Sequence, residues 1–255
     1  MIMKKPVSVV VPTKDDELLT RLLSSLWQTH PDPRDYIVYV VDGGLRERPF
    51  ENSRTLTYIR GSEPFCFAKN VNSGIAAADG ESDIFLVNDD ACFVTYQSLP
   101  QLRTAAEGSP SVGIVSPVFA RPERNPRQRW GVLSASSNLW IETQIILTFA
   151  AVYIRRQLIR AIGLLDESFV GYGFEDNDYC WRTWRSGFQT AILPSVLMMH
   201  GDVFGRASTT FRQRADYAQS IRANRDRFIR KWVGELLSLD GSSAETLIRL
   251  IDSFG

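Results

Sequence analysis

The sequence predicts an α/β fold with a mostly parallel central sheet flanked by helices and followed by a C-terminal helical extension. Short apolar runs of strand length alternate along the chain with segments whose apolar residues recur at helical spacing, as in β-α-β units. Each of the first apolar runs stops at residues typical of turns. The composition, 44% hydrophobic and 23% charged, is that of an ordinary folded domain. Disordered, collagen-like and coiled-coil classes are therefore excluded.

The first unit has the pattern strand, turn, helix. Val7–Val11 is nearly all valine, as expected for a strand buried on both faces of a parallel sheet, and Pro12-Thr13 ends it. Leucines recur at four-residue spacing over residues 15–28. Three acidic residues at the start of that segment favour a helix N-terminus through the helix dipole. The next elements continue the alternation: strand 36–41 before Asp42-Gly43-Gly44, strand 55–59 before Gly61, helix 66–78, and strand 84–87 before Asn88-Asp89-Asp90.

Beyond residue 110 the alternation becomes less regular. The polar stretch 120–140 predicts a mobile insertion or a hairpin between two strands. Ser242-x-x-Glu245 is typical of a capping box and predicts the start of a last short helix. The other expected elements are strands 112–118 and 150–154, helices 155–162 and 175–186, strands 189–193 and 196–199, and a helix over about 210–239. Because no linker and no repeat divides the chain, we expect one continuous core.

The charge balance hides an uneven distribution. The chain has 29 basic and 29 acidic residues, which excludes a generally basic nucleic-acid binder. Residues 206–231, however, hold eight basic and two acidic residues, and residues 121–129 hold four arginines and one glutamate. These two basic segments either steer an anionic ligand or form solvated faces whose charge the acidic remainder balances.

The chain also predicts a cytoplasmic location, either free or at the inner face of a membrane. No apolar run approaches the roughly 20 residues of a transmembrane helix, and Pro12 interrupts the apolar stretch near the start before an export signal develops. The three cysteines are widely spaced and form no CxxC pair, which argues against a disulfide framework or a zinc cluster. We expect them to be reduced core thiols.

Polar residues follow three of the predicted strands at their carboxyl ends, where ligands bind in parallel α/β sheets. These residues are Pro12-Thr13, Asp42 and Asn88-Asp89-Asp90. An Asp-Gly pair such as Asp42-Gly43 is by itself often only a turn. Two adjacent carboxylates after a buried strand repel each other and need a cation or hydrogen-bond donors. A hard divalent ion such as Mg²⁺ or Mn²⁺ meets that need.

A second constellation is Gly171-Tyr172-Gly173-Phe174-Glu175-Asp176-Asn177-Asp178, where glycines allow close approach of the backbone and the carboxylates open a helix. On a helix Glu175 and Asp176 point about 100° apart, so they serve different roles. One faces a substrate while the other fixes a loop or binds an acceptor hydroxyl; alternatively, both only stabilise the helix N-terminus. His200, after an apolar run, is a metal ligand or a structural residue, and His30 is structural.

Six blocks of sequence, in this order and spacing, resemble glycosyltransferase family 2. They are VSVVVPTKDD, VVDGG, CFAKNVNSGIAAADGE, IFLVNDDA, GLLDESFVGYGFEDNDYCWRTWRSGFQTAILP and VLMMHG. The resemblance covers about residues 5–232, because NRDRFIRKW also resembles the helix that follows the catalytic domain in such enzymes. It implies the GT-A (Rossmann-like) fold of nucleotide-sugar-dependent inverting enzymes. The implied division is a catalytic domain at 1–204, with a nucleotide-binding half to about 110 and an acceptor half at 111–204, and a helical extension at 205–255.

The resemblance also implies roles for the candidate residues. Pro12, Thr13 and Asp42 match positions around the nucleotide base and ribose, with Asp42 on the base edge. Lys69 matches a position near the pyrimidine or the diphosphate. Asn72 lies one helical turn after Lys69. Asn88 stands at the first position of the DxD motif, where the family has an acidic residue, Asp89 faces the ribose, and Asp90 and His200 bind a divalent metal, Mn²⁺ or Mg²⁺. Asp176 is the general base, with Glu175 beside it. A UDP or dTDP donor is favoured over GDP.

The predicted reaction is transfer of a sugar from a nucleoside-diphosphate sugar to a hydroxyl of a glycan, lipid-linked glycan or other glycoconjugate. An anionic acceptor is compatible with the basic segments; a membrane surface or nucleic acid is less favoured. Two alternatives remain: a non-catalytic nucleotide-sugar or glycan-binding module and a sugar-1-phosphate nucleotidyltransferase, although PTKDDELL lacks the Gly-rich segment typical of the latter. Trp181 and Trp184 either pack in the core or stack on a sugar. The C-terminal helices cap the domain or pair between subunits.

Overall fold

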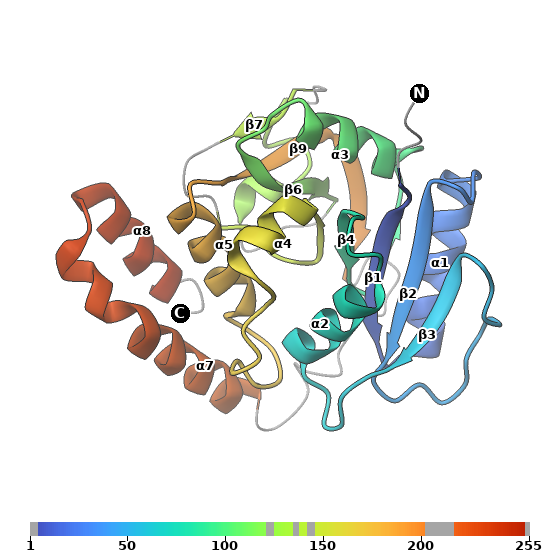
Figure 1. Ribbon diagram of the computed structural model, residues 1–255, viewed down its shortest axis with the longest axis horizontal. Coiled ribbons are helices and arrows are strands. Elements are labelled where there is room, and N and C mark those ends of the chain that lie inside the picture. Colours follow the sequence, from blue (N-terminus) through green and yellow to red (C-terminus); the bar gives the residue numbers. More distant parts are fainter. Residues whose placement is uncertain (1–4, 121–124, 135–137, 142–145, 202–216, 253–255) are drawn as a thin grey trace.

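The computed structural model describes residues 5–120, 125–134, 138–141, 146–201 and 217–252. These residues form one nine-stranded sheet in the order β3-β2-β1-β4-β8-β6-β9-β5, with β7 paired to β9, and helices on both faces (Figure 1). The predicted α/β class is confirmed. The strands are β1 Val7–Thr13, β2 Tyr36–Asp42, β3 Leu56–Arg60, β4 Ile84–Val87, β5 Ala91–Phe93, β6 Val112–Phe119, β7 Trp140–Ile141, β8 Ala151–Ile154 and β9 Gln189–His200. The α-helices are α1 Asp16–Thr29, α2 Phe67–Ala77, α3 Ser98–Glu107, α4 Arg156–Ile162, α5 Glu175–Arg185, α7 Tyr217–Trp232 and α8 Gly241–Asp252.

The first four strands of the sheet run parallel, as predicted. β1 pairs with β2 and β4, and β2 pairs with β3, all in parallel register. The valine run of β1 is buried on both sides: Val9 and Val11 belong to the core on one face, and Val10 to the core on the other. Complete burial of each such side chain contributes roughly 1.5–3 kcal/mol. The apolar run therefore fixes β1 in the middle of the sheet.

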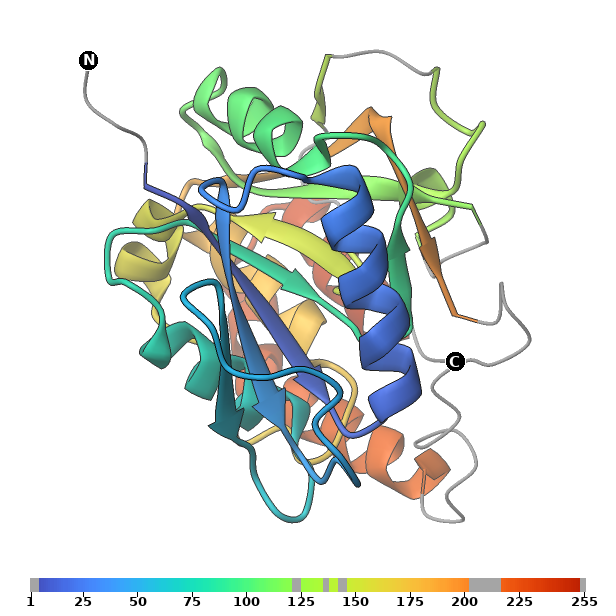
Figure 2. The ribbon, with the colours of Figure 1, turned by 90° about the vertical axis from the view of Figure 1, so that its right-hand side faces the viewer.

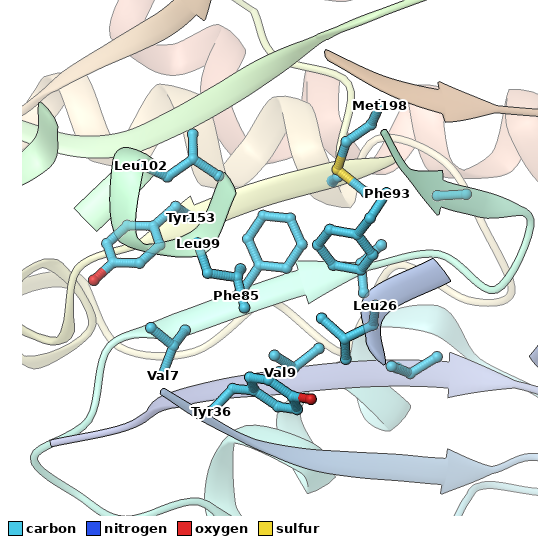
Figure 3. Packing of buried hydrophobic residues seen from close by; sticks show 14 of the residues in the cluster. Val7, Val9, Leu26, Tyr36, Phe85, Phe93, Leu99, Leu102, Tyr153 and Met198 are labelled. Carbon is cyan, nitrogen blue, oxygen red and sulfur yellow. The ribbon is translucent and has the colours of Figure 1, made fainter. Parts of the chain in front are cut away.

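Different helices cover the two faces of the sheet. α1 crosses one face (Figure 2), and its buried leucines belong to the same apolar core as Leu99 and Leu102 of α3. Figure 3 shows part of this core, where Leu26 and Leu99 gather with Phe85 and Phe93. α2, α4 and α5 bury their apolar sides in the second core, on the other face. The sheet thus forms the middle of three layers.

Beyond β4 the sheet becomes mixed. β8 is antiparallel to both β4 and β6, whereas β9 is parallel to β6 and antiparallel to β5 and β7. The two strands predicted at 189–193 and 196–199 are one strand, β9. Its register against β6 shifts between the pairs Ser116–Ile192 and Val118–Leu197. Pro194 lies within that irregularity, where its missing N–H interrupts no regular ladder.

Two elements between residues 91 and 107 were not predicted, namely β5 and α3. At the C-terminus, the helix expected over 210–239 is α7 followed by a 3₁₀ helix, Val233–Ser238, and residues 210–216 lie outside the described residues. The predicted capping box is wrong in detail. Asp240, not Ser242, caps α8, because its Oδ1 accepts a hydrogen bond from the Ser243 N–H at 2.9 Å.

The described part of the stretch 120–140 is anchored to the core rather than separate from it. Gln128 is fully buried. Its amide nitrogen Nε2 donates to Ser116 Oγ at 2.7 Å, and its Oε1 accepts from the Thr148 N–H at 2.8 Å. Arg127 lies over the ring of Trp140. Residues 121–124 and 135–137, on which part of this prediction falls, are outside the described residues.

The C-terminal helices form a further layer beside α5 (Figure 1). Their apolar residues share a third core with α5 and the segment before it, and Trp181, Phe174, Phe228 and Leu247 are all buried there. In the part of the chain that the structure describes, no helix has both the length and the apolar character needed to cross a membrane.

Candidate active site at the carboxyl edge of the sheet

The carboxyl ends of β1, β2 and β3 are fastened together by backbone hydrogen bonds. Thr13 is the register partner of Asp42, and the Gly43 N–H donates to the Thr13 carbonyl at 2.8 Å. The Gly61 N–H, just after β3, donates to the Asp42 carbonyl at 2.7 Å. The predicted convergence of polar residues at this edge is therefore built from the backbone itself.

Asn88-Asp89-Asp90 forms a turn at the same edge, because the Ala91 N–H donates to the Asn88 carbonyl at 3.2 Å. Within it, the Thr13 hydroxyl donates to Asp89 Oδ2 at 2.7 Å, which links β1 to the turn. Asp89 is 8% exposed. Burial, together with the neighbouring charge of Asp90, raises the pKa of Asp89 to about 7, although the Thr13 hydrogen bond opposes that rise.

The two predicted metal-binding residues lie side by side. His200 Nε2 is 3.3 Å from Asp90 Oδ1, and the two side chains are 13% and 9% exposed. The pairing of β5 with the end of β9 produces this contact, because Ala91 is the register partner of His200, and the Gly201 N–H donates to the Asp90 carbonyl at 3.0 Å. The ring of Phe119 lies beside the imidazole. Within the described residues, no set of three or more His, Cys, Asp and Glu side chains surrounds a common point.

Asp42 shapes the loop that follows β2. Its Oδ1 accepts hydrogen bonds from the N–H groups of Gly44 and Leu45, at 3.0 and 2.8 Å, while Oδ2 receives a longer contact from Arg48 Nε at 3.4 Å. The turn chemistry considered from sequence is thus present. The neighbouring Gly43 is closely packed: a Cβ there would lie 2.5 Å from the Phe65 ring. Pro12 is buried beneath this edge.

Lys69 and Asn72 both lie on α2 but have different surroundings. Lys69 is exposed. The Asn72 amide nitrogen donates to the Leu165 carbonyl and to Glu167 Oε1, both at 2.9 Å, and its oxygen accepts from the Leu165 N–H at 3.0 Å. The side chain of Asn72 therefore ties α2 to the loop before α5, and these bonds do not bring it to the Thr13–Asp89 group.

Glu175 and Asp176 occupy the first two positions of α5 and are 2% and 5% exposed. Asp176 Oδ1 accepts from the Asn177 N–H at 2.9 Å. The residue before them, Phe174, has a left-handed backbone with φ of 73°. The loop before α5 reaches the same edge of the sheet, because the Phe67 N–H at the start of α2 donates to the Gly171 carbonyl at 2.8 Å. This bond ties the loop before α5 to the start of α2, which follows β3.

Asp178 belongs to the acidic segment singled out from the sequence, but no role was predicted for its charge. It is fully buried, and its carboxylate meets Arg182 Nε at 2.8 Å, Lys231 Nζ at 2.7 Å and Trp232 Nε1 at 2.9 Å. The four-residue spacing of Asp178 and Arg182 was a signal for part of this group. Lys231 also pairs with Asp166 at 2.6 Å. These contacts fasten α7 to α5.

Several residues singled out from sequence have structural places. Trp181 is 1% exposed, and its ring packs against Trp184 and Trp232, so the core alternative holds for it. His30 is fully buried, and its Nε2 accepts from the Leu99 N–H at 3.1 Å, as predicted for a structural histidine. Burial lowers the pKa of His30 to about 4, despite an opposing backbone hydrogen bond. All three cysteines are free thiols; Cys66 and Cys180 are buried, and Cys92 is partly buried.

A comparison with known protein families shows to which family this chain belongs. Residues 8–162, more than half of the chain, match the family described as glycosyl transferase family 2. The chain belongs to glycosyl transferase family 2. The match ends before Glu175, Asp176 and His200, so the family model itself does not reach the second half of the candidate site.

Solved structures similar to this family 2 chain extend the comparison to its whole length. A mannosyltransferase from Pyrobaculum calidifontis, crystallised with GDP-mannose and Mn²⁺, is similar with a TM-score of 0.66 and 17% identity over 99% of this chain and 70% of that one. S. aureus TarS 1-349 is similar with a TM-score of 0.62 and 18% identity over 98% of this chain and 70% of that one. At these identities the likeness shows the fold, and it confirms the predicted GT-A fold.

A curated relative of this family 2 chain is the uncharacterized protein y4gI of Sinorhizobium fredii, with 24% identity over 83% of this chain. The chain spans 27% of the length of that relative. The relative is thus a much longer protein than this chain.

Proposed function

We propose that this chain transfers a sugar, with inversion, from a nucleoside-diphosphate sugar to a hydroxyl of a glycan or glycoconjugate. The observation that carries the proposal is the contact between Asp90 and His200, two distant residues that meet at the strand ends beside Thr13 and Asp89. The proposed division is a catalytic domain at 1–204, with its nucleotide half to about 110, and an extension at 205–255.

The residues fit a divalent metal. A carboxylate oxygen and an imidazole nitrogen lie 3.3 Å apart, and both side chains are largely removed from bulk water. This mixed oxygen and nitrogen pair favours Mn²⁺ over Mg²⁺, which prefers oxygen ligands. Asp90 and His200 would hold the ion. When bound, the ion supplies positive charge to the departing nucleoside diphosphate. The similar mannosyltransferase was crystallised with Mn²⁺.

The donor is proposed to lie along the strand ends. Asp42 Oδ2, which receives the longer contact from Arg48, is the oxygen that would accept the N–H of a pyrimidine base, so UDP or dTDP is favoured over GDP. Pro12 and Thr13 line the base and ribose, and Asp89 accepts from the ribose. Asn88 contributes at the first position of its turn, and exposed Lys69 approaches the diphosphate. We propose that Asn72 supports this site by holding the 165–167 segment.

Asp176 is proposed as the general base, and it removes the proton of the acceptor hydroxyl as that oxygen attacks the anomeric carbon from the face opposite the diphosphate. Glu175 binds the acceptor or fixes the adjoining loop, because it points in a different direction from the same helix end. A single displacement inverts the centre and needs no second carboxylate as nucleophile. A cytoplasmic location is consistent with three free thiols.

We also propose that the basic segments attract an anionic acceptor. Some of their described residues, however, make contacts within the chain. Arg225 donates to the Ile251 carbonyl, Arg227 to Asn224, and Lys231 pairs with Asp166. Exposed Arg222 and Arg230 are the better probes of steering. Reversing both charges should raise the acceptor KM and flatten its salt dependence; unchanged values would favour the solvated-face alternative.

The test is a thermal-shift panel of UDP-, dTDP- and GDP-sugars with and without Mn²⁺, followed by NMR of the product formed from the stabilising donor. We expect stabilisation that requires Mn²⁺, and a product whose anomeric configuration is inverted. His200→Ala and Asp90→Asn should each remove the effect of Mn²⁺ on UDP binding. Stabilisation without turnover in the presence of any acceptor would indicate a binding module, and no stabilisation at all would overturn the assignment.

A further inference from the structure

Asn224, in the middle of α7, is a buried polar side chain that grips a backbone loop. It is 1% exposed. Its Oδ1 accepts from the Val170 N–H at 3.1 Å, and its Nδ2 lies within hydrogen-bond distance of the carbonyls of Val170, Tyr172 and Gly173, at 3.0, 3.3 and 3.0 Å. An amide offers an acceptor and donors on one short side chain, whereas a carboxylate or an alkyl group of the same size does not.

The loop that Asn224 grips has an unfavourable backbone. Gly171 and Gly173 have φ values of 75° and 104°, and Phe174 has φ of 73°. A left-handed backbone at a residue other than glycine is strained and persists only where the surroundings hold it. α7 provides that hold twice, because the ring of Phe228 also packs against fully buried Phe174, with centroids 5.7 Å apart.

The held conformation determines where α5 begins. Phe174 is the N-cap residue of α5, and its side chain makes no capping hydrogen bond. Glu175 and Asp176 follow immediately, so the φ of Phe174 sets the direction in which both carboxylates leave the loop. The Gly171 carbonyl is fixed on the other side by the Phe67 N–H. The loop is thus clamped between α7 and the nucleotide half.

We propose that Asn224 is a positioning residue for Asp176: by holding residues 170–173 it aims the general base, which makes the C-terminal extension part of the catalytic apparatus. This inference rests on the proposed function. Misplacing a reacting group by about 1 Å costs up to about 100-fold in rate. Asn224→Ala should therefore lower kcat by about 10–100-fold while the donor KM changes less than about two-fold.

The experiment measures nucleotide release from the Mn²⁺-dependent donor found by the panel, together with hydrogen exchange at residues 170–176. Leu247→Ala is the matched control, because Leu247 is fully buried in the same apolar core but lies on α8. It should lower Tm and leave kcat and exchange in the loop unchanged. Asn224→Asp is the second variant: it keeps the size and the bond from Val170, but it places an oxygen against three carbonyls, and it should lower kcat as Asn224→Ala does.

A double-mutant cycle separates positioning from stability. In an Asp176→Asn background, Asn224→Ala should add little further loss of kcat. Without the carboxylate at position 176, the orientation of that side chain no longer affects proton removal. Additive losses, or a loss of kcat no larger than that of Leu247→Ala, would overturn the positioning role. If instead the wild type turns over no donor, the proposed function fails, and exchange at 170–176 still reports whether Asn224 holds the loop.

Discussion

The two halves of the sheet hold their candidate residues by different means. In the parallel half, Thr13, Asp42 and Asp89 stand at strand ends that backbone hydrogen bonds bring together. In the second half, Glu175 and Asp176 stand on a helix whose start is fixed by side chains of a helix about 50 residues later. One half of the site therefore follows from sheet topology, whereas the other depends on α7 side chains that hold the loop before α5.

The largest effect should come from the base itself. Asp176→Asn keeps the size of the side chain but removes its ability to accept a proton, so kcat should fall by about 10²–10⁴-fold while Mn²⁺-dependent donor binding is kept. Glu175→Gln is the matched comparison and should cost less. Steady-state rates and thermal shifts measure both. A larger loss of kcat for Glu175→Gln than for Asp176→Asn would mean that Glu175, and not Asp176, is the general base.

Next in size is the ion-pair group that joins α5 to α7. Asp178→Asn removes a fully buried charge that faces Arg182 and Lys231, and breaking such a group should lower the free energy of unfolding by about 3–5 kcal/mol. Asp166→Asn removes the other, more exposed partner of Lys231 and should cost less. Chemical denaturation measures both values. Equal losses of unfolding free energy in the two variants would show that burial does not determine how much each carboxylate of this ion-pair group stabilises the fold.

The stability of the fold should also fall at acidic pH because of His30, at the end of α1. Burial lowers the pKa of His30 to about 4, so folding favours the neutral imidazole. The unfolded chain takes up a proton below its ordinary pKa of about 6.5, and stability should fall between about pH 6.5 and 4 by roughly 3 kcal/mol. Comparison of wild type with His30→Gln over this range isolates the contribution. Parallel stability curves would contradict it.

The smallest effect tests close packing between α2 and the parallel strands. A Cβ at Gly74 would lie 2.4 Å from Val10 Cγ1 and 3.1 Å from Val41 Cγ2. Gly74→Ala should therefore cost about 1–3 kcal/mol of stability, although alanine has the better helix propensity. Gly80→Ala, at a site with no neighbouring atom within 4 Å, is the control. A stabilising Gly74→Ala would mean that α2 shifts easily.

The sequence analysis predicted the parallel half well, because continuous apolar runs and turn residues are local signals. It missed β5, whose three residues Ala91–Phe93 carry little periodicity, although β5 is the strand that brings Asp90 to His200. It also missed the role of Asn224, because an asparagine on a helix shows its value only when the loop against it is known. Long-range partners of single polar side chains leave no local pattern.

The grip of α7 on the loop before α5 has a consequence for how this chain can be divided. A fragment that ended at residue 204 would lack Phe228, Lys231 and Asn224, and it would uncover Phe174 and leave Asp178 without two of its partners. Such a fragment should aggregate or lose its activity even though every proposed metal and nucleotide ligand is retained. In gene fusion and recombination, the helices after residue 216 must therefore be inherited together with the catalytic domain.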